Sequence, residues 1–444
     1  MQITSIRTTG LGDTTYVLEH EGRGVIIDPQ RDVDRFMPAV ADLDVRFVFE
    51  THLHNDYVSG GIALAGATGA DLVLPAASGA AYRHLPAFHL EDLDAGSFIV
   101  RPIHTPGHTP EHTSYLVLIE GEPVSVFSGG SLLVGSAGRP DLLGMDRADS
   151  LARLQYVSVN RLAELPDDVG LYPTHGEGSF CTVSTTSATS STIGSERVTN
   201  PVLQYEDVEG FVKGQLGVLQ PYPDYYAYMG PLNLMGPMPA PPLGGREIAA
   251  ADIPAGATVV DIRPRADFAA EHLPDSLGIE LSDQTAVWAG WLVDFDAPIV
   301  LVANRDQGVT EVVVQFMRIG FDHVFGVVYD LGDEAGAASF RTASAEELAF
   351  EISSGSSPQI VDVRAPDEWE EGHIDGSSHR YVPDLREGLP SDVGSDRDVW
   401  LICRTGYRAV IAAGLAEQLG AKPVVVTKGG VSSVLALLGA GAAE

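Results

Sequence analysis

The chain has 444 residues, enough for about two to four domains, and its hydrophobic content of 44% is ordinary for a globular protein. Its 61 acidic and 27 basic residues give a formal net charge of −34, which repels phosphate backbones, so we expect no nucleic-acid partner. It has no run of about 18 apolar residues and no basic leader followed by an apolar stretch, so we expect no membrane partner and a cytoplasmic location.

The first 175 residues or so alternate between strand-like and helix-like segments. The pattern predicts strands over residues 25–29, 45–50, 71–75, 113–120 and 124–127, and helices over residues 60–69 and 148–163. Asp149 and Ser150 are candidate caps for the second helix. The Ser/Thr-rich residues 184–195 are predicted to form a loop, and the Pro-, Gly-, Tyr- and Met-rich residues 220–245 an ordered linker or arm.

An internal repeat occupies the chain after residue 245. ATVVDIR (257–263) in the first copy matches QIVDVR (359–364) in the second, and PIVLVANRDQG matches VWLICRTGYRA further on. Each copy covers about 95 residues of βαβ character, which predicts two small α/β domains with parallel sheets. We therefore expect domains over residues 1–245, 246–340 and 341–444.

Histidines and an aspartate gather in three loops of the first domain. In ETHLHNDYVSGG, His52, His54 and Asp56 are spaced two residues apart, so one extended loop can aim all three at one point. HTPGHTPEH supplies His108 and YPTHGEGSF supplies His175. Imidazole and carboxylate ligands that arrive from several strand-end loops indicate a zinc or iron site.

These motifs, with the later FSGGSLLVGSAGRPDL (127–142), resemble the metallo-β-lactamase superfamily, in particular its glyoxalase II and persulfide dioxygenase branch. The resemblance covers residues 10–180 and implies an αββα sandwich. Two positions depart from the family pattern: Tyr57 replaces the second metal-site histidine, and Gly130 replaces the bridging aspartate. The resemblance also implies that Arg139 binds the anionic end of a glutathione persulfide, with a loop salt bridge as the alternative. We assign Arg139 and Tyr57 to substrate binding.

With those two ligands gone, a mononuclear site remains. We predict that His52, His54 and His108 hold the metal, with Asp56 or His175 as further ligands. One Fe(II) per chain is the expected cofactor, because persulfide dioxygenases hold one Fe(II) with two histidines and a carboxylate. Three neutral imidazoles equally suit zinc, which is the alternative.

Cys403 follows an apolar strand and precedes a helix in LICRTGYRA. Backbone N–H groups of this loop, the positive helix end and Arg404 or Arg408 favour a thiolate that attacks sulfane sulfur. The segment resembles the rhodanese active loop. In the first copy Asn304 stands at the matching position and cannot form a thiolate. Cys181 has two interpretations, as packing or as a residue near the metal pocket.

The main functional hypothesis is a persulfide dioxygenase coupled to rhodanese sulfur transfer, acting on a small-molecule thiol persulfide or thiosulfate. The alternatives are a zinc-dependent thioester hydrolase of the glyoxalase II kind, and a sulfurtransferase whose metallo-β-lactamase domain is vestigial. Tyr57 and Gly130 count against the hydrolase, since that chemistry generally uses two metals. The thiol carrier and the oligomeric state, including a homodimer, stay open.

Overall fold

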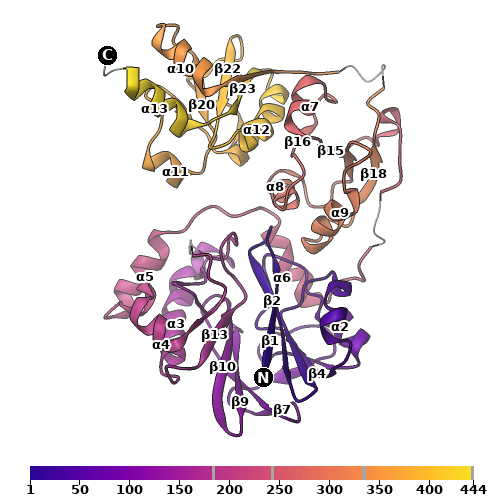
Figure 1. Cartoon of the computed structure of the whole chain (residues 1–444), viewed down its shortest axis with the longest axis vertical. Coiled ribbons are helices and arrows are strands. Elements are labelled where there is room, and N and C mark those ends of the chain that lie inside the picture. Colours follow the sequence, from indigo (N-terminus) through magenta and orange to yellow (C-terminus); the bar gives the residue numbers. More distant parts are fainter. Residues whose placement is uncertain (183–185, 242–244, 333–336, 442–444) are drawn as a thin grey trace. The chain divides into compact units, whose positions relative to one another are not determined.

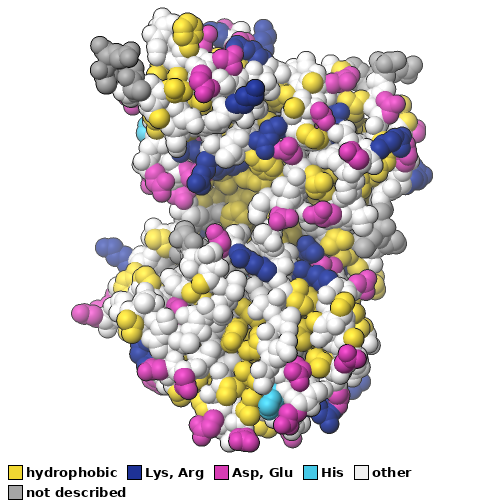
Figure 2. Space-filling view, in the orientation of Figure 1, with side chains coloured by type: hydrophobic (Ala, Val, Ile, Leu, Met, Phe, Trp, Pro, Cys, Tyr) yellow, Lys and Arg dark blue, Asp and Glu magenta, His cyan; other side chains and the backbone are white. Residues whose placement is uncertain are grey.

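The computed structural model describes residues 1–182, 186–241, 245–332 and 337–441. It divides into two compact units, Met1–Pro242 with Val314–Asp322, and Leu243–Val313 with His323–Glu444. Within the described ranges, no helix is both long and apolar enough to span a bilayer. Acidic side chains are spread over the visible face of each unit with basic side chains among them, and histidines are rare there (Figure 2).

Two six-stranded sheets form the centre of the first unit (Figure 1). The first is antiparallel over its first three strands and parallel over the rest. Its order is β1 (Gln2–Thr8), β2 (Asp13–His20), β3 (Arg23–Ile27), β4 (Asp44–Phe49), β5 (Asp71–Pro75) and β6 (Leu85–Ala87). Strands β3, β4 and β5 cover the segments that the sequence predicts as strands near residues 25, 45 and 71.

The second sheet faces the first across a shared core. Its order is β14 (Ser191–Thr192), β13 (Gly170–Pro173), β10 (Glu122–Gly129), β9 (Thr113–Ile119), β8 (Ile99–His104) and β7 (Leu93–Asp94). Only β10 and β13 pair in parallel. Aromatic and β-branched side chains of both sheets fill the core between them, including Tyr16, Phe49 and Tyr115. A two-stranded ribbon, β11 (Leu132–Leu133) and β12 (Ser136–Ala137), follows β10.

Helices cover the outer face of each sheet, which completes an αββα sandwich. Helices α1 (Met37–Val40) and α2 (Gly61–Thr68), with the turn η1 (Val33–Arg35), pack on the first sheet. Helices α3 (Met145–Ala163), α4 (Ile193–Thr199) and α5 (Val208–Gly217), with the turn η2 (Pro201–Leu203), pack on the second. The alternation of strands and helices in the sequence therefore reflects helices that bury one apolar face against a sheet.

Three local predictions differ from the structure. Helix α3 begins at Met145 after Gly144, and Asp149 lies inside it, paired with Arg153 one turn later rather than capping the backbone. The predicted Ser/Thr-rich loop contains β14 and the start of α4, while its residues 184 and 185 lie outside the described residues. The predicted arm contains helix α6 (Tyr226–Met235), with Pro231 inside it, and residues 242–244 of the arm lie outside the described residues.

The second unit holds two parallel sheets, one from each copy of the repeat. The first has the order β16 (Leu277–Gly278), β15 (Thr258–Asp261), β17 (Ile299–Val302) and β18 (Val324–Val328). The same part of the chain holds the turn η3 (Ala250–Asp252) and the helices α7 (Arg265–Ala270), α8 (Thr285–Leu292) and α9 (Val309–Arg318), the last of which belongs to the first unit from Val314 onward. The second has the order β19 (Arg341–Ser344), β23 (Lys422–Lys428), β22 (Asp398–Ile402), β20 (Gln359–Asp362) and β21 (Ser378–His379), with helices α10 (Ala345–Ser353), α11 (Pro366–Glu371), α12 (Tyr407–Gln418) and α13 (Val431–Gly441) and the turn η4 (Val382–Glu387).

The two copies also repeat their internal contacts. After β20, Arg364 forms an ion pair with Asp362 at 2.7 Å and donates to a backbone oxygen eight residues later. After β15, Arg263 pairs with Asp261 at 2.6 Å and donates to the backbone eight residues later in the same way. The shared contact closes the strand-to-helix turn in both copies, so the sequence repeat corresponds to a repeated α/β structure.

Candidate metal centre and thiol loop

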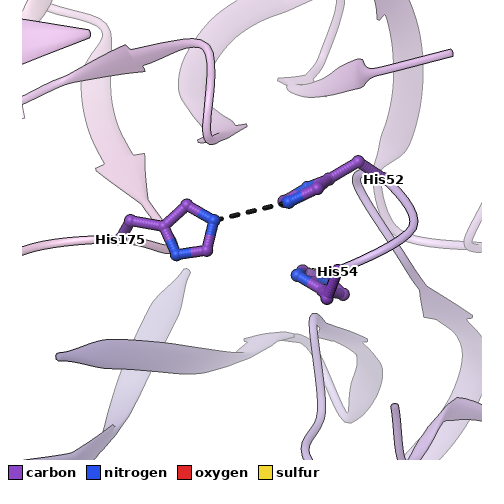
Figure 3. Close-up of side chains that lie close together, drawn as sticks. All are labelled: His52, His54 and His175. Carbon is purple, nitrogen blue, oxygen red and sulfur yellow. Dashed lines mark hydrogen bonds between the residues drawn. The ribbon is translucent and has the colours of Figure 1, made fainter. Parts of the chain in front are cut away.

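The predicted metal ligands meet at one edge of the two facing sheets. His52 and His54 follow β4, His108 follows β8 and His175 follows β13. The centroid of the His52 ring lies 4.1, 4.9 and 5.3 Å from those of His54, His108 and His175. All four imidazoles are buried, with at most 1% exposure. Strands that end at a common edge thus bring together residues separated by more than 100 positions in the chain (Figure 3).

Hydrogen bonds fix which nitrogen of His52 and His108 carries the lone pair. The Thr51 hydroxyl donates to Asp28, so it accepts from His52 Nδ1, at 2.8 Å. The carbonyl oxygen of Arg139 can only accept, so His108 Nδ1 donates to it, also at 2.8 Å. In both rings Nε2 is therefore the lone-pair nitrogen, and that of His108 is buried without a hydrogen-bond partner among the described residues. Hydrogen bonds of this kind, made by the Nδ1 atoms of His52 and His108, are the ones that orient metal-binding histidines in proteins.

The other two rings are held by carboxylates. His175 Nδ1 lies 2.8 Å from Asp13 Oδ1, which leaves Nε2 pointing at His52 Nε2, 3.4 Å away (Figure 3). His54 Nε2 lies 3.1 Å from Glu50 and 3.2 Å from Asp28, so its Nδ1 is the ligand atom, buried and unpartnered among the described residues. Each of the four imidazoles thus presents one nitrogen to the cluster and anchors the other.

Part of the cluster has the spacing of a divalent-ion site. Two imidazole nitrogens bound at the usual distance of about 2.0–2.1 Å in a tetrahedron are about 3.3 Å apart, close to the 3.4 Å between the Nε2 atoms of His52 and His175. The candidate ligand atoms of His52, His54 and His175 lie within 4.8 Å of one another, as do those of His108, His175 and Cys181. His175 belongs to both groups, but the ligand atoms of the predicted trio, His52, His54 and His108, do not form one such group among the described residues.

Burial and neighbouring charges divide the four histidines into two pairs. Burial lowers the pKa of His108 to about 3 and that of His52 well below its ordinary value, so both rings are neutral at pH 7. Burial also opposes protonation of His175, but the Asp56 charge and the hydrogen bond to Asp13 raise its pKa to about 10. Asp28 and Glu50 likewise outweigh burial and raise the pKa of His54 well above its ordinary value. Metal binding must therefore displace protons from the second pair.

Asp56 lies beside the cluster and bonds to its neighbours. One of its oxygens accepts from the Cys181 thiol at 3.3 Å and lies 3.3 Å from His175 Nδ1. The other oxygen is buried and unpartnered among the described residues. Asp56 is therefore placed both to orient His175 and to offer an oxygen ligand.

Tyr57 and Arg139 are buried and already engaged. The Tyr57 ring stacks on His54 at 4.2 Å between centroids, and its hydroxyl lies 3.0 Å from His54 Nε2. Arg139 forms a two-point ion pair with Asp141, both contacts at 2.7 Å, and its guanidinium lies over the ring of Tyr222. The geometry matches the loop salt bridge that the sequence left open for Arg139, and it makes Tyr57 a support for His54.

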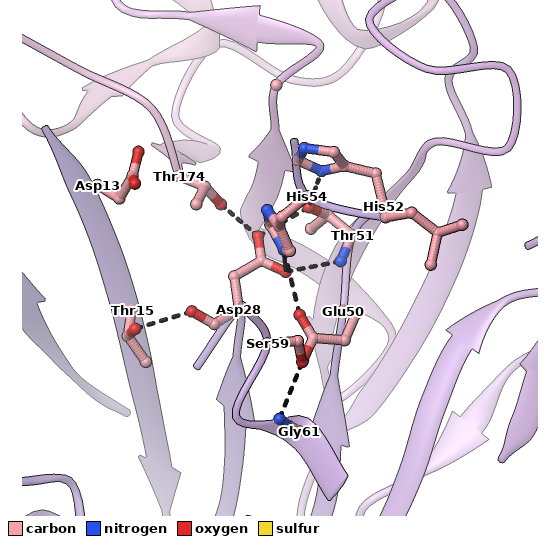
Figure 4. Close-up of polar contacts among 12 residues, drawn as sticks. Asp13, Thr15, Asp28, Glu50, Thr51, His52, His54, Ser59, Gly61 and Thr174 are labelled. Carbon is pink, nitrogen blue, oxygen red and sulfur yellow. Dashed lines mark hydrogen bonds and ion pairs between the residues drawn. The ribbon is translucent and has the colours of Figure 1, made fainter. Parts of the chain in front are cut away.

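Sequence reasoning missed several supporting residues. Asp28, directly after β3, accepts from the backbone and hydroxyl of Thr51, from Thr174 and from His54 (Figure 4). Asn233, in helix α6, donates to the backbone oxygens of His54 and Tyr57, both at 2.8 Å. A charged residue inside an otherwise apolar predicted strand, residues 25–29, was a usable signal for Asp28. Nothing in the composition of the predicted arm pointed to Asn233.

The imidazole of His108 occupies the space that a side chain at position 130 needs. A Cβ built on Gly130 would meet His108 Cδ2 in a clash and lie 2.7 Å from Nε2. The Gly130 N–H donates to His112 Nε2 at 3.0 Å. This hydrogen bond occupies the lone pair of His112, so that ring is a scaffold residue. Glycine is thus required at 130 by the packing of His108, and its φ lies outside the left-handed region.

For this reason we expect Gly130→Asp to displace His108 rather than restore a ligand. The expected result is a loss of metal occupancy and of about 1–3 kcal/mol of stability, as for other overpacked sites. Metal analysis and thermal unfolding measure both effects. Gly66→Ala is the matched control, since a Cβ there meets nothing within 4 Å and helix α2 should be unchanged or more stable. A gain in Fe(II) occupancy in Gly130→Asp would contradict this packing argument.

Cys403 lies at the turn between β22 and α12. Its side chain is buried, and the Gly406 N–H donates to Sγ at 3.2 Å. Arg404 is exposed, whereas Arg408 forms an ion pair with Glu368, with Nη2 2.9 Å from Oε1. Gly406 has a φ of 88°, and a Cβ there would lie 2.8 Å from Thr427 Cα, so the turn that presents the N–H to sulfur requires glycine.

The first copy of the repeat contacts this loop within the second unit. Arg265 donates to the Thr405 carbonyl oxygen at 3.0 Å, and Tyr407 donates to the Glu280 carbonyl oxygen at 3.0 Å. In the equivalent loop of the first copy, the Gln307 side chain accepts from the Asn304 N–H at 2.8 Å. That loop is thus closed by its own side chain, whereas the Cys403 loop is braced from outside.

Comparisons with known proteins agree with this architecture. Residues 8–175 match the model of the metallo-beta-lactamase superfamily, and residues 344–437 match that of the rhodanese-like domain. Facing sheets with flanking helices and a buried imidazole cluster define the metallo-β-lactamase class. The chain belongs to the metallo-β-lactamase superfamily, and its C-terminal part is a rhodanese-like domain.

Three curated relatives match parts of the chain. A hydroxyacylglutathione hydrolase of Aeromonas hydrophila is 30% identical over 170 residues, 36% of this chain and 59% of that protein. The probable polyketide biosynthesis zinc-dependent hydrolase BaeB of Bacillus velezensis is 31% identical, over 35% of this chain and 68% of that protein. The probable adenylyltransferase/sulfurtransferase MoeZ of Mycobacterium tuberculosis is 33% identical, over 26% of this chain and 29% of that protein. The chain thus spans less than two thirds of the first and third.

Two solved structures are also similar. A metallo-beta-lactamase from Staphylococcus aureus has a TM-score of 0.69 at 25% identity and covers 74% of this chain and 99% of its own. That share exceeds the first compact unit, so the likeness extends into the second. ETHE1 from Myxococcus xanthus is 30% identical, with a TM-score of 0.46, and covers 52% of this chain and 98% of its own.

Proposed function

We propose that the chain oxidises a low-molecular-weight thiol persulfide to sulfite at its metal centre and transfers sulfane sulfur at Cys403. The overall oxidation is RSSH + O2 + H2O → RSH + SO3²⁻ + 2H⁺. The observation that carries the proposal is the combination, in one chain, of a buried imidazole cluster and a rhodanese-like thiol loop. The metal centre would then consume or supply the sulfur compound on which Cys403 acts.

The metal centre is proposed to hold one Fe(II) through His52, His54 and His108, with His175 and Asp56 as further ligands. A bound ion would supply open positions for substrate and O2. The chain itself supplies the orientation of the imidazoles through Thr51, the Arg139 carbonyl and the carboxylates behind His54 and His175. Burial of the cluster excludes bulk water from the reacting sulfur.

At the second centre, the Cys403 thiolate attacks the outer sulfur of thiosulfate or of a persulfide. With thiosulfate the step is Cys–S⁻ + S2O3²⁻ → Cys–S–S⁻ + SO3²⁻, in which the S–S bond of thiosulfate breaks and sulfite leaves. The Gly406 N–H stabilises the negative sulfur before and after the transfer. Both copies of the repeat are proposed to be rhodanese-like, with the first reduced to support because Asn304 is not a nucleophile.

A zinc-dependent thioester hydrolase is the second candidate, favoured by the names of two relatives, a hydroxyacylglutathione hydrolase and a zinc-dependent hydrolase. Against it stand Tyr57 and Gly130, which offer no ligand for a second ion. A sulfurtransferase with an inactive metal centre is the third. In every case the proposed partners are small molecules and include neither nucleic acid nor membrane.

The test is metal analysis of the full chain, followed by oxygen uptake after anaerobic loading with Fe(II). We expect about one iron per chain and one O2 consumed per persulfide, with sulfite as product. Two zinc ions per chain with thioester hydrolysis would support the second candidate. No bound metal, together with sulfur transfer that needs only Cys403, would support the third. Either result would overturn the proposed oxidation.

A further inference from the structure

The Cys181 thiol lies in the metal centre, although it is not part of the family's ligand pattern. It follows His175 by six residues, and its side chain is fully buried. Its sulfur lies within 4.8 Å of the candidate ligand nitrogens of both His108 and His175. Its backbone is held on both sides, with its oxygen accepting from the Arg139 N–H at 2.9 Å and its N–H donating to Ser179 Oγ.

Two buried polar atoms point to a ligand at this position. His108 Nε2 and Asp56 Oδ1 have no hydrogen-bond partner among the described residues, and both side chains are buried. A lone pair left unpaired in a buried site costs free energy unless a further group or ion satisfies it. The Cys181 sulfur lies near both side chains, within 4.8 Å of the His108 ligand nitrogen and 3.3 Å from the other oxygen of Asp56.

The charge of the cluster also calls for an anionic ligand. Position 130, which carries a carboxylate in relatives with the full ligand set, is glycine, and His108 fills the space of its side chain. The imidazoles are neutral when they bind a metal, so buried anions must offset the charge of the ion. Asp13 and Asp56 lie against His175, and a Cys181 thiolate would add an anion within 4.8 Å of the ligand nitrogen of His108. A thiolate is a strong ligand for zinc and iron and supplies one negative charge.

We propose that Cys181 is a thiolate ligand of the metal centre, beside His108 and His175, and replaces the carboxylate lost at position 130. The inference rests on the proposed binding of a metal at this cluster. Binding is Cys–SH + M²⁺ → Cys–S–M⁺ + H⁺, with no change in oxidation state. In the metal-free site the thiol donates to Asp56 Oδ2 at 3.3 Å, and its proton is released when the metal binds.

The test uses Co(II) as a spectroscopic probe in the full chain carrying Cys403→Ser, so that Cys181 is its only thiol. We expect the visible d–d bands of bound Co(II) together with a near-ultraviolet thiolate-to-metal charge-transfer band. Adding Cys181→Ser should remove the charge-transfer band, keep d–d bands from the imidazoles, and weaken Co(II) binding at least about tenfold.

The possible outcomes separate the two proposals. Bound Co(II) without a charge-transfer band in Cys403→Ser would refute the proposal that Cys181 is a ligand, but not the proposed metal centre. The absence of d–d bands would refute the metal centre itself. A second measurement needs no change at 181: X-ray absorption of the zinc-loaded Cys403→Ser chain should show a sulfur at about 2.3 Å beside nitrogens at about 2.0–2.1 Å. A shell of nitrogen and oxygen alone would refute the thiolate.

Discussion

Cys403→Ser is expected to abolish sulfur transfer from thiosulfate, with a loss of at least about 10³-fold, because loss of a catalytic nucleophile leaves only binding and electrostatic effects. Serine is nearly the same size, so the Gly406 N–H and the loop can keep their geometry. Its hydroxyl is not ionised near neutral pH and forms no persulfide. The measurement is sulfite release, with mass spectrometry of the persulfide adduct after a single turnover.

The matched control is Asn304→Ala, at the equivalent position of the first copy. Asn304 donates to Asp267 at 2.9 Å, and no hydrogen bond among the described residues joins its side chain to the Cys403 loop, so full activity is expected. Circular dichroism of both variants guards against misfolding. If the sulfur adduct were found on Cys181 in the parent chain, the working thiol would have been misassigned, and the role of Cys403 would fall with it.

The double variant His52→Ala, His108→Ala is expected to lose at least about nine tenths of the bound metal. Each imidazole presents the lone pair of Nε2, and a hydrogen bond at Nδ1 fixes its orientation. The partner is Thr51 for His52 and the Arg139 carbonyl oxygen for His108. Loss of even an outer contact costs about 10–100-fold in metal affinity, and loss of two direct ligands costs more. Metal content after dialysis against a fixed free-metal concentration provides the measurement.

Chelation gives an independent readout of the same site. A ligand at about 100 times its Kd stabilises the folded state by about 2.7 kcal/mol, so removing the metal from the parent chain should lower its Tm. In the double variant the chelator should have no effect. His104→Ala is the matched control, because His104 is only partly buried and its Nε2 contacts the Pro110 carbonyl oxygen. Full metal occupancy in the double variant would show that the ion lies elsewhere.

The burial of Tyr57 shows why the contacts of a loop residue could not be read from residue types. The sequence places Tyr57 one position after Asp56 and suggests a role in substrate binding. In the structure its ring stacks on His54, and its hydroxyl is used within the cluster. The direction of a side chain in an irregular loop depends on what packs behind it, here Asn233 from a helix about 170 residues away.

The sequence by itself determined several strands of the first unit, the repeat and the identity of the clustered histidines. Hydrophobic runs of strand length, such as those of β4 and β5, are local features, and so are the short spacing of His52 and His54 and the turn glycine after Cys403. These properties depend on neighbouring residues along the chain, so a pattern of residue types is enough to find them.

Only the tertiary structure decided which atoms face the metal centre. Asp28 lies more than 20 residues from His52 and Cys181 more than 120 from Asp56, yet each pair is joined through one hydrogen-bond network. The meaning of Gly130 likewise depends on the His108 ring, which reaches it from another loop. Such contacts arise where strands of two sheets end at one edge, and close packing then assigns each imidazole its free nitrogen and leaves no room for a side chain at position 130.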